Sequence, residues 1–149
     1  MKLLVSACLL GDACRYDGKS KPCEAVLRLK RSHTLIPVCP EVMGGLPTPR
    51  VPSEVQEDRS VRNREGQDVT LLYRAGAREV LRVALEENCD GAILKEKSPA
   101  CGKGKIYDGS FTKTLTDGNG ICAELLLQNG ISVLGESEIS DETLSKIKK

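Results

Sequence analysis

The sequence predicts a fold of the α/β class, a three-layer α/β/α arrangement around a mostly parallel sheet of about four to five strands. Short apolar runs alternate with helical patterns along the chain, and this order is typical of a parallel sheet covered on both faces. The 149 residues, 40% of them hydrophobic, are also enough for one domain with a buried core. We therefore expect a single domain spanning residues 1–149.

Four short apolar runs supply the expected strands. They cover residues 2–8, 34–38, 91–94 and 131–134. Their continuous apolar character suits strands that are buried on both faces, since half-exposed strands alternate apolar and polar residues. Right-handed crossovers between such strands make the predicted arrangement Rossmann-like.

Helical patterns separate these runs. Ser20-Lys21-Pro22 predicts the start of a short helix that ends near residue 31, because Ser is a good N-cap and Pro suits the first turn. Further helices are expected over 121–129 and after Ser140. A strong amphipathic pattern predicts a helix over 70–88, whose buried side is expected to carry Leu71, Leu72, Ala75, Val80, Leu81, Val83, Ala84 and Leu85.

Two long segments show almost no periodicity. One covers residues 40–67 and is rich in Pro and Gly, and the other is the Gly-rich segment 98–120. Loops of this length inside a compact domain are usually functional or disordered. In parallel sheets, ligands bind beyond the carboxyl ends of the strands, so we expect a functional site near these segments.

The charge balance narrows the classes of partner. With 22 basic and 21 acidic residues, the chain lacks the positive excess that drives binding to RNA or to an anionic membrane, so RNA is possible but not favoured. No segment approaches the ~20 apolar residues of a membrane span, and the apolar stretch before Cys8 is shorter than the ~7–15 residues of a signal peptide. These features predict a cytoplasmic protein that binds a small molecule.

The seven cysteines are the unusual feature of the composition. Their odd number and wide spacing argue against a disulfide scaffold, and no two of them form a C-x-x-C motif. Cys8 ends the first predicted strand, Cys39 follows the second, and Cys101 lies in the loop after the third. We expect these three thiols to converge at one edge of the sheet. The role of Cys14 stays open, and packing thiols are expected at Cys23, Cys89 and Cys122.

Three thiolates from distant segments suit an iron–sulfur cluster, because soft sulfur ligands select Fe–S, Zn or Cu(I). With three protein ligands one iron stays open and can act as a Lewis acid. Zinc held by the three cysteines and His33 is the competing assignment. It is less favoured because His33 precedes the second predicted strand, at the opposite end of the sheet.

Polar and aromatic residues accompany the three cysteines. Glu41 follows Cys39 by two residues and suits a general acid or base, although it could instead pair with Arg50. Ser98 precedes Cys101 by three residues, where its hydroxyl could contact a substrate or cap the turn begun at Pro99.

Three of the four aromatic residues lie in two loops that share a Tyr-Asp-Gly triplet, namely Tyr16, Tyr107 and Phe111. Asp-Gly by itself forms a tight turn, but aromatic rings beside it suit stacking on a planar ligand. The candidates for substrate binding are therefore Tyr16, Arg50 and Tyr107.

Several motifs together resemble the bacterial thiouracil desulfidase family over nearly the whole chain. They are Ser6-Ala7-Cys8-Leu9-Leu10-Gly11, Arg15-Tyr16-Asp17-Gly18, the segment Cys39-Pro40-Glu41 through Arg50, Asp68-Val69-Thr70, Ser98-Pro99-Ala100-Cys101-Gly102 and Ile106-Tyr107-Asp108-Gly109. The chain ends soon after its last predicted helix, so it is expected to be the short form without the additional domain of some relatives.

The resemblance implies a [4Fe-4S] cluster held by Cys8, Cys39 and Cys101, with the sulfur of a thiolated pyrimidine on the open iron. The substrate would be thiouracil or a thiouridine. Desulfuration would be a non-redox hydrolysis in which water attacks the C–S carbon, Glu41 transfers protons and Ser98 assists at the substrate. An exposed cluster of this kind is expected to be lost from protein prepared in air.

Two other interpretations stay open at this point. The chain could be a non-catalytic iron–sulfur or zinc binding module in which Glu41 has no acid–base role. It could also be a nucleotide-binding domain with buried structural thiols, although its glycine-rich stretches match neither the dinucleotide fingerprint nor a P-loop.

Overall fold

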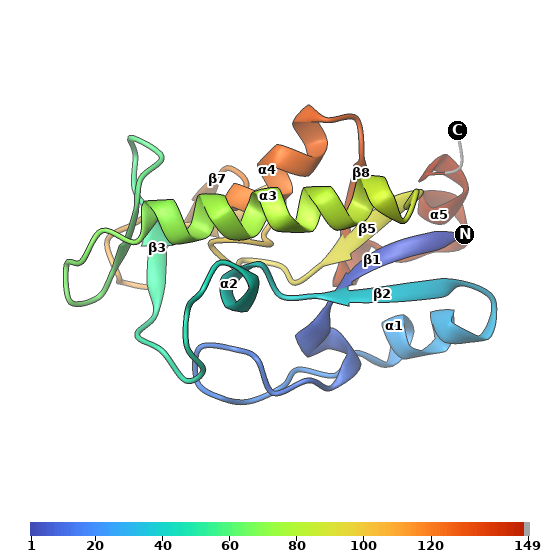
Figure 1. Ribbon diagram of the computed structural model, residues 1–149, viewed down its shortest axis with the longest axis horizontal. Helices are drawn as coiled ribbons and strands as arrows, with labels where there is room; N and C mark the ends of the chain where they lie inside the picture. The colour runs from blue at the N-terminus through green and yellow to red at the C-terminus, as the bar shows by residue number, and fades with distance from the viewer. Residues whose placement is uncertain (148–149) are drawn as a thin grey trace.

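The computed structural model describes residues 1–147, and its centre is a four-stranded parallel sheet (Figure 1). The strands are β1 (Lys2–Ser6), β2 (Thr34–Val38), β5 (Gly91–Leu94) and β8 (Ser132–Gly135), in the spatial order β2-β1-β5-β8. All neighbouring strands in this sheet are parallel. The predicted α/β class and parallel sheet are confirmed.

Helices cover both faces of this sheet. The helices α3 (Thr70–Glu86) and α4 (Ile121–Gln128) share one apolar cluster with Leu4, Ala92 and Leu94 of the strands. The helices α1 (Glu24–Arg28) and α5 (Asp141–Ile147) share a second cluster with alternate strand residues, including Leu3 and Ile93. Successive strand residues therefore face opposite layers, which explains the continuous apolar runs.

The segments predicted to be irregular contain regular structure. Residues 40–67 hold the short helix α2 (Pro40–Met43) and a hairpin of β3 (Ser53–Val55) and β4 (Val61–Asn63). Residues 98–120 hold a second hairpin, of β6 (Lys105–Tyr107) and β7 (Leu115–Asp117). Each of these strands has three residues, which is too short for an alternating pattern to stand out in the sequence.

Residues 1–147 also contain three 3₁₀ turns: η1 (Ala7–Leu10), η2 (Leu29–Arg31) and η3 (Glu136–Glu138). Two predicted boundaries shift as a result. Cys8 lies in η1, just beyond β1, and the first helix begins at Glu24 rather than at Ser20-Lys21-Pro22. No helix among residues 1–147 combines the length and the apolar character that crossing a membrane requires.

The predicted buried side of α3 was wrong at three leucines. Leu71 is 77% exposed, and Leu72 and Leu85 are also exposed. Val80 and Ala84 are buried as predicted, and the other buried residues on this side are Thr70, Tyr73, Gly76 and Ala77. Small residues on this side let the helix approach its neighbours closely. The positions of the small residues, and not those of the leucines, therefore decide which side of the helix is buried.

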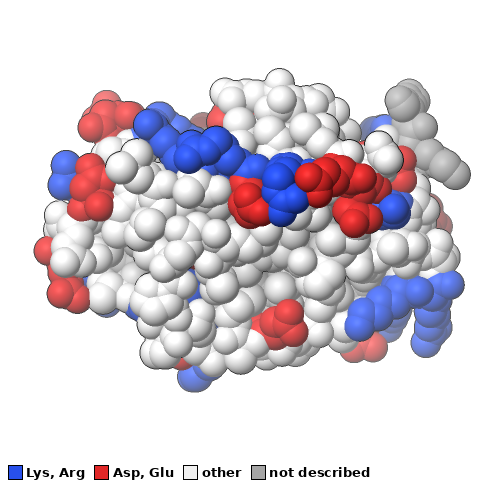
Figure 2. All heavy atoms as spheres, viewed as in Figure 1, with Lys and Arg blue, Asp and Glu red and all other residues white. Residues whose placement is uncertain are grey.

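The outer side of α3 carries a band of charged side chains (Figure 2). Arg82 forms ion pairs there with Glu79 and Glu86, one turn away on either side. Exposed pairs of this kind stabilise a helix by only a few tenths of a kcal/mol, about 0.2–0.5 each. The band marks the solvent face of the helix, and burial of the opposite side fixes its position.

Two glycines let α2 pack directly on α3. A Cβ atom at Gly76 would lie 1.8 Å from the carbonyl oxygen of Pro40, and one at Gly44 would lie 2.1 Å from the carbonyl oxygen of Leu72. Real Cβ atoms do not come this close to backbone oxygens, so the contact requires glycine at both positions. The contact fixes the segment that follows β2, which includes Cys39 and Glu41.

Substitution of Gly76 tests this contact. We expect Gly76→Ala to lower the free energy of unfolding by about 2–3 kcal/mol, because the new methyl group must push the two helices apart. In a helix with open space at this position, the same change would raise the free energy of unfolding by about 1 kcal/mol. The sign of the measured change therefore shows whether the close contact exists. Denaturant titration measures the effect. The control is Leu71→Ala at an exposed position of the same helix, which should change the free energy of unfolding by less than about 0.5 kcal/mol. An unchanged or higher stability of Gly76→Ala would contradict the packing.

Burial of Cys122 gives a testable pH dependence. This α4 thiol is fully buried, and burial raises its pKa from 9.0 to about 12. Between these values the unfolded chain loses the Cys122 proton while the native chain keeps it, so stability falls as pH rises. Between about pH 9 and 11 the free energy of unfolding of the wild type should fall with pH. We expect this fall to be smaller in Cys122→Ala by about 1.4 kcal/mol per pH unit. Denaturant titrations across this range measure both slopes, and equal slopes would contradict the expectation.

Candidate functional site

A cavity of about 250 Å³ opens where β1, β2 and β5 end. Its wall includes residues that directly follow each of these strands, as expected for a parallel sheet. All eight residues predicted for the site line it, namely Cys8, Tyr16, Cys39, Glu41, Arg50, Ser98, Cys101 and Tyr107. The predicted convergence of distant segments is therefore observed in the fold.

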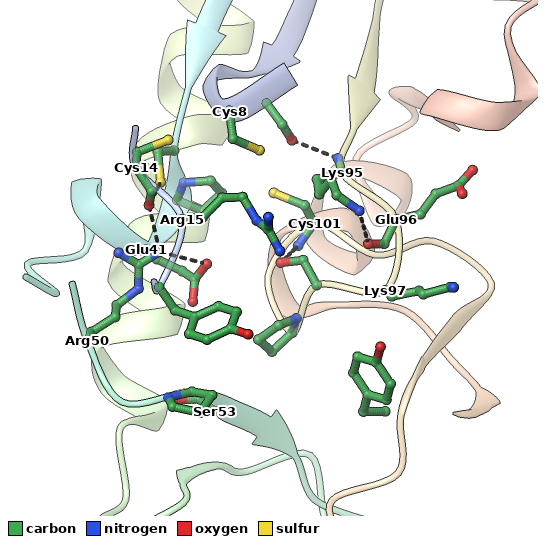
Figure 3. A pocket seen from close by; sticks show the side chains of 18 of the residues that line it. Cys8, Cys14, Arg15, Glu41, Arg50, Ser53, Lys95, Glu96, Lys97 and Cys101 are labelled. Carbon is green, nitrogen blue, oxygen red and sulfur yellow. Dashed lines mark hydrogen bonds and ion pairs between the residues drawn. The ribbon is translucent and has the colours of Figure 1, made fainter. Parts of the chain in front are cut away.

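Four thiols share the wall of this cavity. Figure 3 shows Cys8 and Cys101 pointing toward the same space, with Cys14 beside them. The Cys39 thiol lies 3.8 Å from the carbonyl oxygen of Cys14 and donates to it, and the Cys14 thiol interacts with those of Cys8 and Cys39. All four cysteines are free. Cys14, which the sequence left open, thus belongs to the site.

The surroundings keep two of these thiols protonated. Interaction with the Cys14 thiol, followed by burial, raises the pKa of Cys39 far above its ordinary value. Burial is also the main cause that raises the pKa of Cys101, with the neighbouring Cys122 adding to it. Metal ligation requires the thiolate, so binding of a metal group here would release protons.

A helix N-terminus holds the loop that carries Cys101. The Ser98 hydroxyl accepts hydrogen bonds of 3.1 Å from the backbone N–H groups of Ala100 and Cys101. The carbonyl of Ala100 in turn accepts the N–H of Cys122 in the first turn of α4, at 2.9 Å. Ser98 therefore has the capping role that the sequence offered as its alternative, and its own proton stays available for donation.

Glu41 lies at the start of α2 with each carboxylate oxygen held by a different donor. Its Oε1 is 3.2 Å from Nη2 of Arg50, and its Oε2 accepts a hydrogen bond from the hydroxyl of Tyr73. The expected pairing with Arg50 is thus present. The contact with Tyr73 was not predicted, because the expected buried side of α3 did not include this tyrosine.

Arg50 connects the loops around the cavity. Its Nη1 donates to the carbonyl of Pro47 and the hydroxyl of Thr48, both at 3.1 Å, and its Nη2 donates to the carbonyl of Cys14 at 2.9 Å as well as to Glu41. The side chain is only 4% exposed. Because these donors face protein acceptors, contact of Arg50 with a substrate stays a prediction.

Positive charge dominates the cavity wall despite the near-neutral composition. Six basic residues line it against three acidic ones: Arg15, Arg50, Arg64, Lys95, Lys97 and Lys113 against Glu41, Glu54 and Glu96. Lys97 and Lys113 adopt left-handed backbone conformations, with φ of 69° and 60°. Such strain is concentrated at functional sites. Most of these cations were missed because they come from separate loops.

Of the three aromatic residues predicted near the site, two line the cavity and one does not. Tyr16 and Tyr107 line the cavity, and Tyr16 carries the Arg15 guanidinium 5.9 Å from its ring centre. Phe111 lies outside the described wall, in a turn held by a hydrogen bond from its backbone N–H to the buried Glu54 carboxylate. Two of the three predicted aromatics are therefore placed to stack on a ligand.

The donor set of the cavity, four free thiols from separate segments, suits an iron–sulfur group because soft sulfur ligands select Fe–S. Within residues 1–147, no three His, Cys, Asp or Glu side chains are arranged to hold one metal ion. A single zinc ion needs its donors at about 2.0–2.3 Å from one point, whereas each iron of a cluster takes its own thiolate. His33 lies beyond reach, at the opposite end of the sheet, where its Nδ1 is 3.1 Å from the N-terminal amine.

Comparison with known proteins gives three concordant matches. The profile of the 2-thiouracil desulfurase family matches residues 3–138. The uncharacterized protein YbbK of Bacillus subtilis (strain 168) is 40% identical over 148 residues, which cover 93% of this chain and 98% of that protein. The solved structure of TudS, a [4Fe-4S]-dependent thiouracil desulfidase, is 41% identical over 97% of both chains, with a TM-score of 0.90. The chain belongs to the 2-thiouracil desulfurase family.

Proposed function

We propose that the chain is a single-domain desulfidase that removes sulfur from thiolated pyrimidines, such as thiouracil or a thiouridine, by non-redox hydrolysis. The convergence of Cys8, Cys39, Cys101 and Glu41 on one cavity at the sheet edge carries this proposal. Family membership and the similarity to TudS support it.

The proposal assigns Cys8, Cys39 and Cys101 as the ligands of a [4Fe-4S] cluster. Bound by three thiolates, such a cluster supplies one iron without a protein ligand, which is a Lewis acid for a sulfur atom. The excess of cations on the cavity wall supports this assignment, because positive charge stabilises the thiolate forms of the ligands.

Glu41 is the proposed acid–base group. Arg50 and Tyr73 hold its two oxygens on the protein side, and its remaining lone pairs are free to accept a proton from water in the cavity. The hydroxide equivalent adds to the carbon that bears sulfur, a carbonyl replaces the thiocarbonyl, and the sulfur leaves as sulfide. No electrons are gained or lost in this balance.

Ser98, Tyr16 and Tyr107 are the proposed substrate contacts. Ser98 accepts two backbone N–H groups, so its O–H is oriented away from them and can donate to a ring oxygen or nitrogen. The two tyrosines on the cavity wall offer faces for a pyrimidine ring. Seven free thiols support a reducing, cytoplasmic location, and the Bacillus relative supports a bacterial source.

Removal of the Glu41 charge tests the acid–base role. We expect Glu41→Gln, purified without oxygen, to keep its iron and acid-labile sulfide but to lose at least about 100-fold in turnover of thiouracil, since general acid–base catalysis contributes 10²–10⁴-fold. The matched control Glu79→Gln alters an exposed carboxylate of α3 and should keep wild-type turnover. Absence of iron and sulfide from reconstituted wild-type protein, or full activity of Glu41→Gln, would refute the proposal.

Single cysteine replacements test the ligand assignment. Cys8→Ser, Cys39→Ser and Cys101→Ser should each lower the iron and sulfide bound per chain, because a neutral hydroxyl is a poor iron ligand. Cys14→Ser should retain the cluster, and Cys89→Ser, at a residue outside the cavity wall, is the control for handling losses. Loss of the cluster from Cys14→Ser together with its retention in one of the first three variants would reassign the ligands.

A further inference from the structure

The phenol of Tyr73 is a buried group beside the site that has no assigned part in the proposed hydrolysis. This residue is 1% exposed in α3, and it is not among the described residues that line the cavity. Its hydroxyl nevertheless donates to Oε2 of Glu41. Tyr73 therefore reaches the site only through that carboxylate.

The contact between α2 and α3 brings the two residues together. Tyr73 precedes Gly76 by three residues on the buried face of α3, and Glu41 follows Pro40, whose carbonyl oxygen closely approaches Gly76. Residues three apart on a helix are neighbours on one side. The glycine contact thus sets the distance over which the phenol meets the carboxylate.

Two donors on different oxygens fix a carboxylate more firmly than one. Arg50 alone would hold Oε1 and leave the carboxylate free to pivot about that bond, whereas the added bond from Tyr73 to Oε2 defines its plane. Ser53 of β3 also interacts with the Tyr73 phenol and acts to lower its pKa. Burial and the nearby Glu41 charge raise the pKa of Tyr73, so the phenol keeps its proton and stays a donor.

We propose that Tyr73 is a positioning residue of the desulfidase, which acts with Arg50 to hold the carboxylate of Glu41 in the one orientation that serves the cavity. The inference rests on the proposed function, because it assigns Tyr73 a task in the acid–base step. Tyr73 contributes orientation and exchanges no proton with the substrate.

The first test is Tyr73→Phe in the cluster-loaded protein, assayed without oxygen on thiouracil. We expect kcat to fall about tenfold, as one part of the 10²–10⁴-fold that a positioned acid–base group contributes, with KM changed less than about twofold. Iron and sulfide per chain should be unchanged. The matched control is Thr70→Val, which removes a buried hydroxyl of the same helix that bonds Val61 and Asp68, and it should keep the wild-type kcat.

The second test measures coupling with the carboxylate. Glu41→Asp shortens the side chain and withdraws the carboxylate from Tyr73, so adding Tyr73→Phe to it should lower kcat by less than about twofold further. A merely structural role of Tyr73 would give a full, additive loss in that background. Where Tyr73→Phe fails to fold, Ser53→Ala replaces it, and we expect about a threefold loss in kcat with an unchanged KM.

Several outcomes would overturn the inference and leave the proposed function intact. They are wild-type kcat in Tyr73→Phe or in its replacement Ser53→Ala, an additive loss in the double variant, an equal loss in Thr70→Val, and loss of the cluster from Tyr73→Phe. Full activity of Glu41→Gln would instead refute the proposed function itself, so the two failures are distinguishable.

Discussion

The near contact between the Pro40 carbonyl and Gly76 is the constraint on which the site depends. It sets α2 directly against α3, with no side chain between the two backbones. Cys39 and Glu41 flank Pro40, so their positions at the end of β2 follow from this contact. A larger residue at position 76 would move a thiol and a carboxylate of the cavity together, and so would couple the packing of the core to the chemistry of the site.

The other side of the cavity is fixed by backbone hydrogen bonds of a different kind. The loop that carries Cys101 gives its carbonyls to the first N–H groups of α4, while Ser98 satisfies two N–H groups within the loop. The helix N-terminus is thereby capped, and the loop gains one defined conformation. Rigid helices on both sides therefore hold residues from irregular segments, which is what a site with pre-positioned groups requires.

Local features explain which parts of the fold could be predicted from the sequence. Apolar strand runs are a local signal, and the geometry of parallel sheets then places Cys8, Cys39 and Cys101 at one edge. The buried face of α3 is not a local property. Leu71 appears as a core residue in any count of apolar positions, yet the close approach of α2 at Gly76 rotates the helix so that it is exposed.

The long-range contacts of the site had no sequence signal. Tyr73 and Glu41 are 32 residues apart, and Arg50 reaches Cys14 across 36 residues. Spacing and periodicity describe one element at a time, so they identify Glu41 as a candidate without naming the groups that orient it. The proposed acid–base role of Glu41 followed from residue type and position, whereas the groups that hold its carboxylate became visible only in the packing of α2 against α3.

The charge of the cavity wall relates the thiols of the site to the groups that hold Glu41. Without a bound metal group the thiols of Cys39 and Cys101 are held neutral, and the six basic residues of the wall outnumber its three acidic ones. Loading three thiolates into this wall would bring negative charge to a place where positive charge is already fixed. Because Arg50 and Tyr73 each hold one oxygen of Glu41, that added charge would meet a carboxylate whose orientation is fixed. The two donors that orient the carboxylate thus also hold it in place beside an anionic group.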